Sequence, residues 1–296
     1  MSSKNFGCRE EDDLATAWAK AYRKMWKTPK RELSPFAVTV CNPSGIVIPD
    51  SIKHPMVRSL DACLKACDKG YQPVDLVATT IFPERTWKLC DGDRKEFYRE
   101  SMLNLRTYAK WEPNKNRCGM YFGRLFGFGI DHRTGKSLGY EAGKAMREAS
   151  GNQVEHLIRQ LTKSVKTGRS VARMQLQAAT FDPMRDMTTS GQPSFPCMQH
   201  IAFNTDIKSL SLELTAFYAT QQLYVKAYGN WLGLCRLGAF IACQSGLNLT
   251  RFTCFANVQK MDKSPVPGAE RDALNREVRI AAGLAIKTDE VVLTHG

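Results

Sequence analysis

The sequence has no apolar run that approaches the roughly 18 residues needed to cross a membrane. Its opening residues, MSSKNFGCREEDD, contain no apolar signal core. From these two absences we expect a cytoplasmic protein that does not enter a membrane. No GxxxxGK[ST] motif is present either, so a P-loop nucleotide site is not expected. No internal repeat, low-complexity tract or change of composition marks a linker, and we expect one domain over residues 1–296.

Spacings typical of metal sites are also missing. The 10 cysteines are scattered along the chain, and in a cytosolic protein such cysteines are expected to be reduced thiols. The close pair Cys63 and Cys67 has CxxxC spacing, and no matching His or Cys pair follows it, whereas structural zinc sites combine two pairs. We therefore expect no metal site.

Positive charge is what the sequence has in excess. Lys+Arg 42 against Asp+Glu 29 give a formal net charge of +13. A hydrophobic fraction of 43% and a charged fraction of 24% exclude wholesale disorder. A basic chain of this size is expected to meet phosphate groups, in a nucleotide or a nucleic acid. The alternative is a basic surface without such a partner.

The hydrophobic pattern predicts a mixture of helices and strands. Residues 10–27 predict a helix with acidic residues at its start and basic residues at its end, and we expect its apolar face to pack on a core rather than on a membrane or nucleic acid. Residues 201–216 alternate as a β-hairpin does. Residues 74–82 fit a buried strand or a buried helix, and residues 129–151 fit a loop or a weak helix. Further helices are predicted at 95–110, 152–165 and 221–245, and further strands at 37–41, 174–180 and 247–258. This order predicts an α/β (α+β) fold with a large mixed sheet packed with helices.

Cys197 is the candidate nucleophile. It directly follows Pro196 and precedes a predicted strand, which places it at an exposed strand entrance. A thiolate at such a place is a good nucleophile when nearby cations lower its pKa. We expect it to be the most reactive thiol, because Cys235, Cys243 and Cys254 lie in apolar runs. The alternative is a buried structural thiol.

Several short segments occur in an order and spacing that match one known family. They are Phe122-Gly123-Arg124-Leu125, Asn152-Gln153, Phe181-Asp182-Pro183, Phe195-Pro196-Cys197, His200 to Phe203 with the predicted hairpin, and Tyr228-Gly229-Asn230-Trp231. Together they resemble the thymidylate synthase superfamily, which includes the pyrimidine nucleotide hydroxymethylases. The similarity covers about residues 121–262, while residues 1–120 and 263–296 diverge.

The resemblance implies covalent catalysis on a pyrimidine. The family's nucleophilic cysteine matches Cys197, which would add to C6 and let C5 attack the one-carbon unit of 5,10-methylenetetrahydrofolate. The family's uracil-reading asparagine matches Asn230, and an amide both donates and accepts hydrogen bonds. Members acting on cytosine usually carry aspartate there, so uracil is the expected base. The family's catalytic tyrosine matches Phe122, and its neighbour Tyr121 is the candidate. Family members are homodimers, and we expect a homodimer here.

The chain departs from the family in the segment after the hairpin. The family's Tyr-Gln-Arg-Ser-x-Asp corresponds here to Phe217-Tyr218-Ala219-Thr220-Gln221-Gln222. Thr220 keeps the hydroxyl of the serine, and Ala219 replaces an arginine that binds phosphate. Gln222 replaces the aspartate that holds the pterin, so the folate lacks its usual carboxylate partner.

The sugar and phosphate contacts differ as well. Asn257 and Gln259 stand where the family places a His and a Tyr on the sugar 3′-hydroxyl, which predicts a substrate other than dUMP, such as a ribonucleotide or a modified nucleotide. In the family, paired arginines reach across to the phosphate of the partner subunit. The candidates for this role, in order of preference, are Arg173, Arg169, and then Arg31 and Arg124.

Two functions follow from these residues. The first is an enzyme that transfers a methyl or hydroxymethyl group to C5 of a pyrimidine mononucleotide through a Cys197 adduct. The second is a catalytically degenerate homodimer of the same fold that binds a nucleotide, RNA or a protein partner. The retained Pro-Cys pair and Asn230 favour the enzyme, whereas the altered family segment and the +13 charge favour the binding protein.

Overall fold

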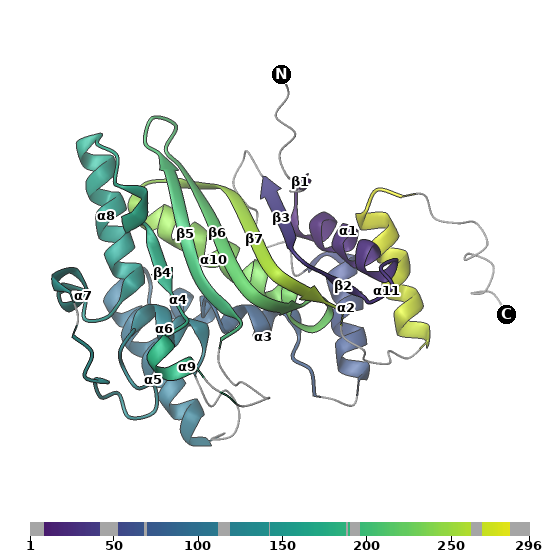
Figure 1. Cartoon of the computed structure of the whole chain (residues 1–296), viewed down its shortest axis with the longest axis horizontal. Coiled ribbons are helices and arrows are strands. Elements are labelled where there is room, and N and C mark those ends of the chain that lie inside the picture. The colour runs from purple at the N-terminus through teal and green to yellow at the C-terminus, as the bar shows by residue number, and fades with distance from the viewer. Residues whose placement is uncertain are drawn as a thin grey trace.

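The architecture is a mixed sheet with helices packed against one of its faces (Figure 1). The computed structural model describes residues 9–41, 53–67, 70–111, 119–141, 143–187, 189, 196–261 and 268–284. The sequence Asn42-Pro43-Ser44-Gly45 predicts a turn after the strand expected at 37–41, and these four residues lie outside the described part of the chain. The expected α/β class with a large mixed sheet is confirmed.

Seven strands of the described residues form one sheet in the order β1-β3-β7-β6-β5-β4, with β2 also paired to β7. β5 and β6 form the predicted antiparallel hairpin, whereas β6 and β7 run parallel. The strands are β1 (Arg9–Glu11), β2 (Glu32–Leu33), β3 (Phe36–Cys41), β4 (Gln177–Ala179), β5 (Met198–Asp206), β6 (Ser211–Gln222) and β7 (Asn248–Lys260).

The helices of the described residues lie beside this sheet, and most of them share one hydrophobic core with it. They are α1 (Leu14–Trp26), α2 (Pro55–Ala66), α3 (Val74–Thr79), α4 (Glu84–Leu89), α5 (Arg94–Trp111), α6 (Tyr121–Phe126), α7 (Lys144–Glu148), α8 (Gln153–Thr167), α9 (Pro183–Asp186), α10 (Tyr228–Ser245) and α11 (Gly268–Ala281). Two shorter turns are the 3₁₀ helix η2 (Arg173–Gln175) and the π-helix η3 (Leu223–Ala227). Among the helices so described, none is long and apolar enough to cross a membrane.

The connection from β6 to β7 organises the centre of the fold. Parallel neighbours need a crossover, and here α10 supplies it, with nearly every residue buried. The helix ends at Gly246, whose positive φ of 75° closes the last turn. The predicted helix over 221–245 starts too early, because residues 221 and 222 still belong to β6 and η3 follows. A buried strand end and a buried helix are both apolar, so the pattern alone does not separate them.

The other predicted elements are largely confirmed. α1 begins at Leu14 with Asp13 as its N-cap, while residues 9–11 form β1 instead of helix. The indole of Trp18 on α1 donates a hydrogen bond to the Leu223 carbonyl at 3.0 Å, so this helix does pack on the core. Residues 74–82 include the helix α3, and the strand predicted at 174–180 is reduced to β4 after η2.

Two glycines allow α10 to lie directly against α3. A Cβ at Gly229 would be 2.6 Å from the Cβ of Val77 and 2.7 Å from the carbonyl oxygen of Val74. A Cβ at Gly233 would be 2.6 Å from the carbonyl oxygen of Ala78. These contacts are with backbone and with a β-branched side chain, which cannot swing aside. The short distance between α10 and α3 therefore requires glycine at both positions.

We expect Gly229→Ala to lower the free energy of unfolding by about 1–3 kcal/mol, because the added methyl overpacks a closed helix contact. Denaturant unfolding of wild type and variant measures this difference. Gly268→Ala is the control, since a Cβ at Gly268 meets nothing within 4 Å. Equal loss of stability in both variants would show that the α10–α3 contact is not the cause.

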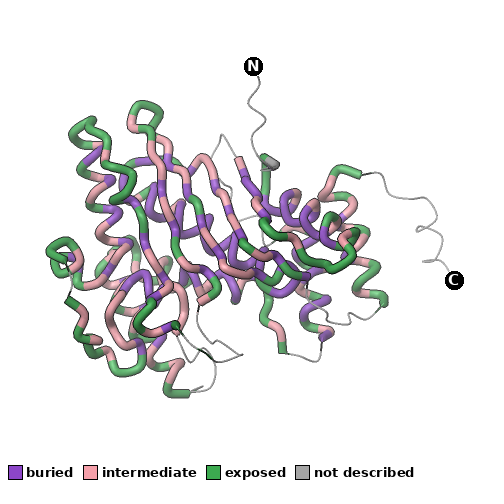
Figure 2. Tube along the Cα trace, viewed as in Figure 1, coloured by how far each residue is buried: buried purple, intermediate pink, exposed green. Residues whose placement is uncertain are grey.

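Residues along the central strands of the sheet alternate between buried and less buried positions (Figure 2). On β6, Leu212, Leu214, Ala216 and Tyr218 are buried toward the helices, while the intervening positions are half-buried or exposed. β5 follows the same pattern along most of its length. One face of the sheet thus belongs to the core, and the opposite face is open in the described part of the chain.

Candidate functional site

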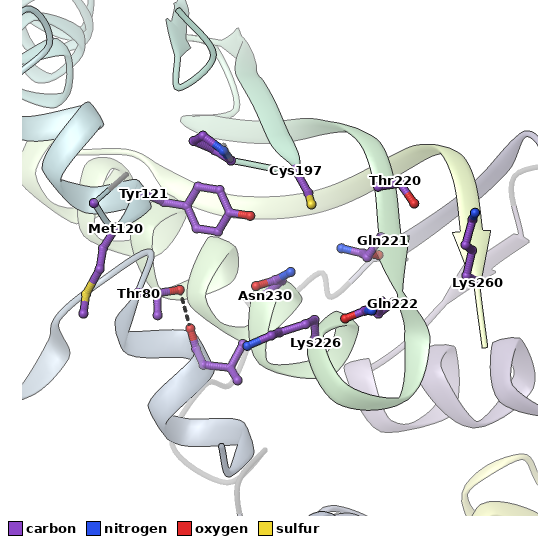
Figure 3. A pocket seen from close by; sticks show the side chains of 13 residues that line it. Thr80, Met120, Tyr121, Cys197, Thr220, Gln221, Gln222, Lys226, Asn230 and Lys260 are labelled. Carbon is purple, nitrogen blue, oxygen red and sulfur yellow. Dashed lines mark hydrogen bonds between the residues drawn. The ribbon is translucent and has the colours of Figure 1, made fainter. Parts of the chain in front are cut away.

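A pocket of ≈ 510 Å³ opens at the carboxyl end of β6 (Figure 3). Its walls come from the end of β6, η3, the first turn of α10, α3, the start of α6 and the residues just before β5. The predicted site residues Tyr121, Cys197, Thr220, Gln222 and Asn230 all line it. Side chains from segments far apart in the sequence thus share one cavity.

The remaining predicted residues lie outside the lining of this pocket. Arg173 in η2 and Arg169 after α8 are both exposed on the surface. Arg31 is exposed, and its guanidinium lies 4.4 Å from the ring centroid of Trp26. The predicted role of Arg173 and Arg169 concerns a partner subunit and stays a prediction.

Asn257 and Gln259 on β7 lie outside the pocket lining too. Asn257 is exposed, and its carbonyl accepts a hydrogen bond from Ser34 Oγ. Gln259 is fully buried, where β7 pairs with Leu33 of β2 and Gln221 of β6. The cations that do line the pocket are Lys226 and Lys260, which sequence reasoning missed. Neither lysine belongs to a segment that matches the family. Lys226 reaches the pocket because it lies in η3, and Lys260 reaches it because the register of the sheet places the end of β7 beside the end of β6.

Cys197 presents its sulfur to the centre of the pocket (Figure 3). The residue is exposed, although the surrounding walls withdraw the thiol from water and raise its pKa above the usual range. The charge of Lys226 acts in the opposite direction and favours the thiolate. Cys243, expected inside an apolar helix, is also exposed, because it lies on the side of the last turn of α10 that faces solvent, while Ala242 and Ser245 of the same turn remain buried. Exposure alone therefore does not single out Cys197.

Tyr121 places its hydroxyl beside the sulfur of Cys197 (Figure 3). The hydroxyl oxygen accepts a hydrogen bond from the backbone N–H of Met198 at 3.4 Å. Burial raises the pKa of Tyr121 well above its usual range, and the neighbouring Cys197 raises it further, so the phenol is neutral near pH 7. Phe122, the residue that matches the family's tyrosine, is buried in the core instead. The neighbour, not the matched position, faces the pocket.

Asn230 faces Cys197 from the first turn of α10 (Figure 3). Its residue is 5% exposed, and its amide makes no side-chain hydrogen bond with the described residues. A buried amide in contact with a cavity is well placed to bind a polar ligand, because it can both donate and accept.

Gln221 is a pocket residue that the sequence did not single out. Its Oε1 accepts a hydrogen bond from Trp231 Nε1 at 3.1 Å, while its Nε2 has no partner in the described residues. Its residue is 2% exposed. The family motif has no fixed residue type at position 221, so the resemblance did not point to Gln221. Its hydrogen bond with Trp231 joins β6 to α10, and a contact between two elements is visible only in the folded structure.

Arg124 is committed to a buried ion pair and does not reach the pocket. Its two terminal nitrogens donate to the two carboxylate oxygens of Asp186 at 2.9 and 2.8 Å. A third hydrogen bond reaches the carbonyl of Thr180. The expectation that Arg124 could bind phosphate is therefore wrong, because its charge is already used to join α6 to the segment that precedes Cys197.

No metal site forms in the part of the chain that the structure describes: no three His, Cys, Asp or Glu side chains converge. No protein-family model matches the chain, and no curated protein sequence matches it. The thymidylate synthase resemblance therefore depends on the quoted residues alone.

We expect alkylation of Cys197 to quicken as pH rises, because the thiolate reacts and the raised pKa leaves mostly thiol near neutral pH. Lys226→Met removes the charge that favours the thiolate and should move the rate profile to higher pH. Lys260→Met is the matched control and should leave the profile unchanged. Iodoacetamide labelling followed by peptide mapping measures the rate at Cys197. Identical profiles for wild type and Lys226→Met would contradict the expected role of Lys226.

Proposed function

We propose that this protein is a thymidylate synthase-like enzyme that acts on C5 of a pyrimidine nucleotide through a covalent adduct at C6. The proposal is supported by one observation above all: Cys197, Tyr121 and Asn230 line a single pocket of ≈ 510 Å³, which lies in the size range of small-molecule sites. The transferred group is a hydroxymethyl group, or a methyl group where a hydride donor completes the reaction.

The chemistry begins at Cys197. The thiol releases its proton to solvent, a step favoured by the charge of Lys226. The sulfur then bonds to C6, and the C5–C6 π electrons move toward C4 and O4 to form an enolate. C5 bonds to a one-carbon electrophile at the oxidation level of formaldehyde, whose C=O π electrons move to oxygen, and that oxygen takes up a proton to give the hydroxymethyl group. C5 then loses its original hydrogen as a proton, the C–H electrons restore the C5–C6 double bond, and the sulfur leaves C6 with the electrons of the S–C6 bond. Asn230 is placed to bind the edge of the base, and the neutral Tyr121 hydroxyl can hold a water beside the sulfur.

The described residues do not fit the folate of the family. No Asp or Glu lies in the described lining of the pocket. Gln222, at the position of the family's aspartate, is exposed and offers a single neutral carbonyl as acceptor. Such a carbonyl cannot take both N–H groups of a pterin edge as a carboxylate does. We therefore derive no step through 5,10-methylenetetrahydrofolate.

A nucleotide-binding protein without turnover is the second candidate. The raised pKa of Cys197 and the lack of a carboxylate base in the described lining favour it. In that function the pocket amides would bind the base, the pocket lysines would bind the phosphate, and Cys197 would form no covalent bond with the nucleotide. The two candidates differ in whether C5 of a bound nucleotide becomes labile.

We expect the protein to release tritium from C5-labelled UMP or dUMP into water. Exchange needs only thiolate addition at C6, protonation at C5 and reversal, so it does not depend on the one-carbon donor. Cys197→Ala should abolish release, whereas Cys243→Ser, which changes the other thiol that is exposed among the described residues, should retain it. A folded wild type that binds these nucleotides, as a rise in melting temperature, yet releases no tritium would support the binding function instead.

We also propose a homodimer formed through the open face of the sheet. Phe217 of β6 and Phe255 of β7 lie side by side on this face, with ring centroids 5.4 Å apart and planes at 14°. His200 of β5 extends the row, with its ring centroid 6.3 Å from that of Phe217. Aromatic side chains on a flat sheet face form the kind of apolar surface that a second copy can cover.

We expect light scattering at micromolar protein to give twice the chain mass of 33.3 kDa. Phe217→Lys combined with Phe255→Lys should give a monomer, because two cations would have to be buried in the interface. Leu103→Lys on α5 is the control, since Leu103 is an exposed apolar side chain on a helix away from the sheet face. A wild-type monomer, or a dimer unaffected by the double change, contradicts this arrangement.

A further inference from the structure

The side-chain amide of Gln221 has a fixed orientation. An indole N–H can only donate a hydrogen bond, so the atom of Gln221 that meets Trp231 Nε1 at 3.1 Å must be the oxygen. The amide nitrogen is therefore on the other side, and it points into the pocket toward Cys197 and Asn230 (Figure 3). This assignment follows from hydrogen-bond chemistry and not from the shape of the side chain.

The group that fixes Gln221 is itself held in place. Trp231 is fully buried, and its ring stacks on Phe36 with centroids 6.5 Å apart and planes at 8°. Rotating the amide of Gln221 would place two N–H donors against each other in a buried site, which is strongly unfavourable. The pocket therefore contains a donor that cannot become an acceptor.

We propose that Gln221 selects uracil-type over cytosine-type nucleotides by donating from Nε2 to the carbonyl O4. This inference rests on the proposed function. O4 is conjugated with C6, so addition of the Cys197 sulfur places negative charge on that oxygen, and the donor stabilises it. Cytosine carries an amino group at the same position. Its N–H groups would face the Nε2 donor, leaving both unsatisfied.

Asn230 cannot make this choice alone. Its amide makes no side-chain hydrogen bond with the described residues, so nothing there fixes which end faces the ligand. An amide that is able to rotate satisfies either a carbonyl or an amino group. Uracil preference thus comes from Gln221 and Trp231 rather than from the Asn230 position that the family resemblance emphasised.

The test is to reverse the hydrogen-bonding character of position 221. Gln221→Glu keeps an oxygen for Trp231 and presents a second oxygen, an acceptor, to the pocket. Binding of UMP and CMP is measured by titration calorimetry. Wild type should prefer UMP by about 10- to 100-fold, and Gln221→Glu should prefer CMP. Gln222→Glu adds the same charge to the adjacent pocket residue and should retain the preference for UMP.

A second variant covers a failure of the first to fold. Trp231→Phe removes the indole donor and frees the Gln221 amide to rotate, so the ratio of UMP to CMP affinity should fall toward one. A Gln221→Glu or Trp231→Phe protein that folds and retains the wild-type preference overturns this inference while the proposed function stands. Wild type that binds neither nucleotide overturns both. Cys197→Ala should bind with the wild-type preference, because selection by Gln221 precedes the covalent step.

Discussion

The parallel pairing of β6 with β7 is the constraint on which the site depends. Parallel neighbours cannot be joined by a tight turn, so the chain must leave the carboxyl end of β6, cross the sheet as α10 and return as β7. The end of the strand, the π-helix η3 and the first turn of α10 therefore meet at one edge. In open α/β sheets this edge is where ligands bind. Gln221, Lys226 and Asn230 follow one another around that bend.

Two buried tryptophans, one on α1 and one on α10, donate hydrogen bonds to the bend. Trp18 of α1 donates to the Leu223 carbonyl, which lies in the π-helix. Trp231 of α10 donates to the Gln221 side chain at the end of the strand. Each indole spends its single donor on the same short stretch of chain. A π-helix is an uncommon conformation that is frequent at functional sites. Here α1 donates a hydrogen bond to its Leu223 carbonyl, and α10 donates one to Gln221 of the strand that leads into it.

The sequence predicts the helices and strands better than it predicts the side-chain contacts between them. The hairpin and α1 follow from apolar periodicity and α10 follows from a long apolar run, and all of these signals are local. The joint position of Cys197 and Asn230 in one pocket follows from the resemblance. The orientation of Gln221 could not be predicted, because it needs a contact with Trp231 on another element. The ion pair of Arg124 could not be predicted for the same reason, because it needs a contact with another element: Asp186 accepts hydrogen bonds from both terminal nitrogens of Arg124. The exposure of Cys243 could not be predicted either, because an apolar helix does not show which side of its last turn faces solvent.

The close approach of α10 to α3 has a consequence for how the pocket meets its ligands. Val77 and Thr80 form a wall that cannot move toward α10, because Gly229 and Gly233 already bring the two backbones into contact. Movement away would open a gap in a densely packed interior. The inner part of the cavity therefore keeps a fixed shape when a ligand binds. Adaptation to ligands of different length falls to its exposed rim, where Gln222 and Lys260 carry long side chains and the Lys260 ammonium lies 3.7 Å from the Glu32 carboxylate.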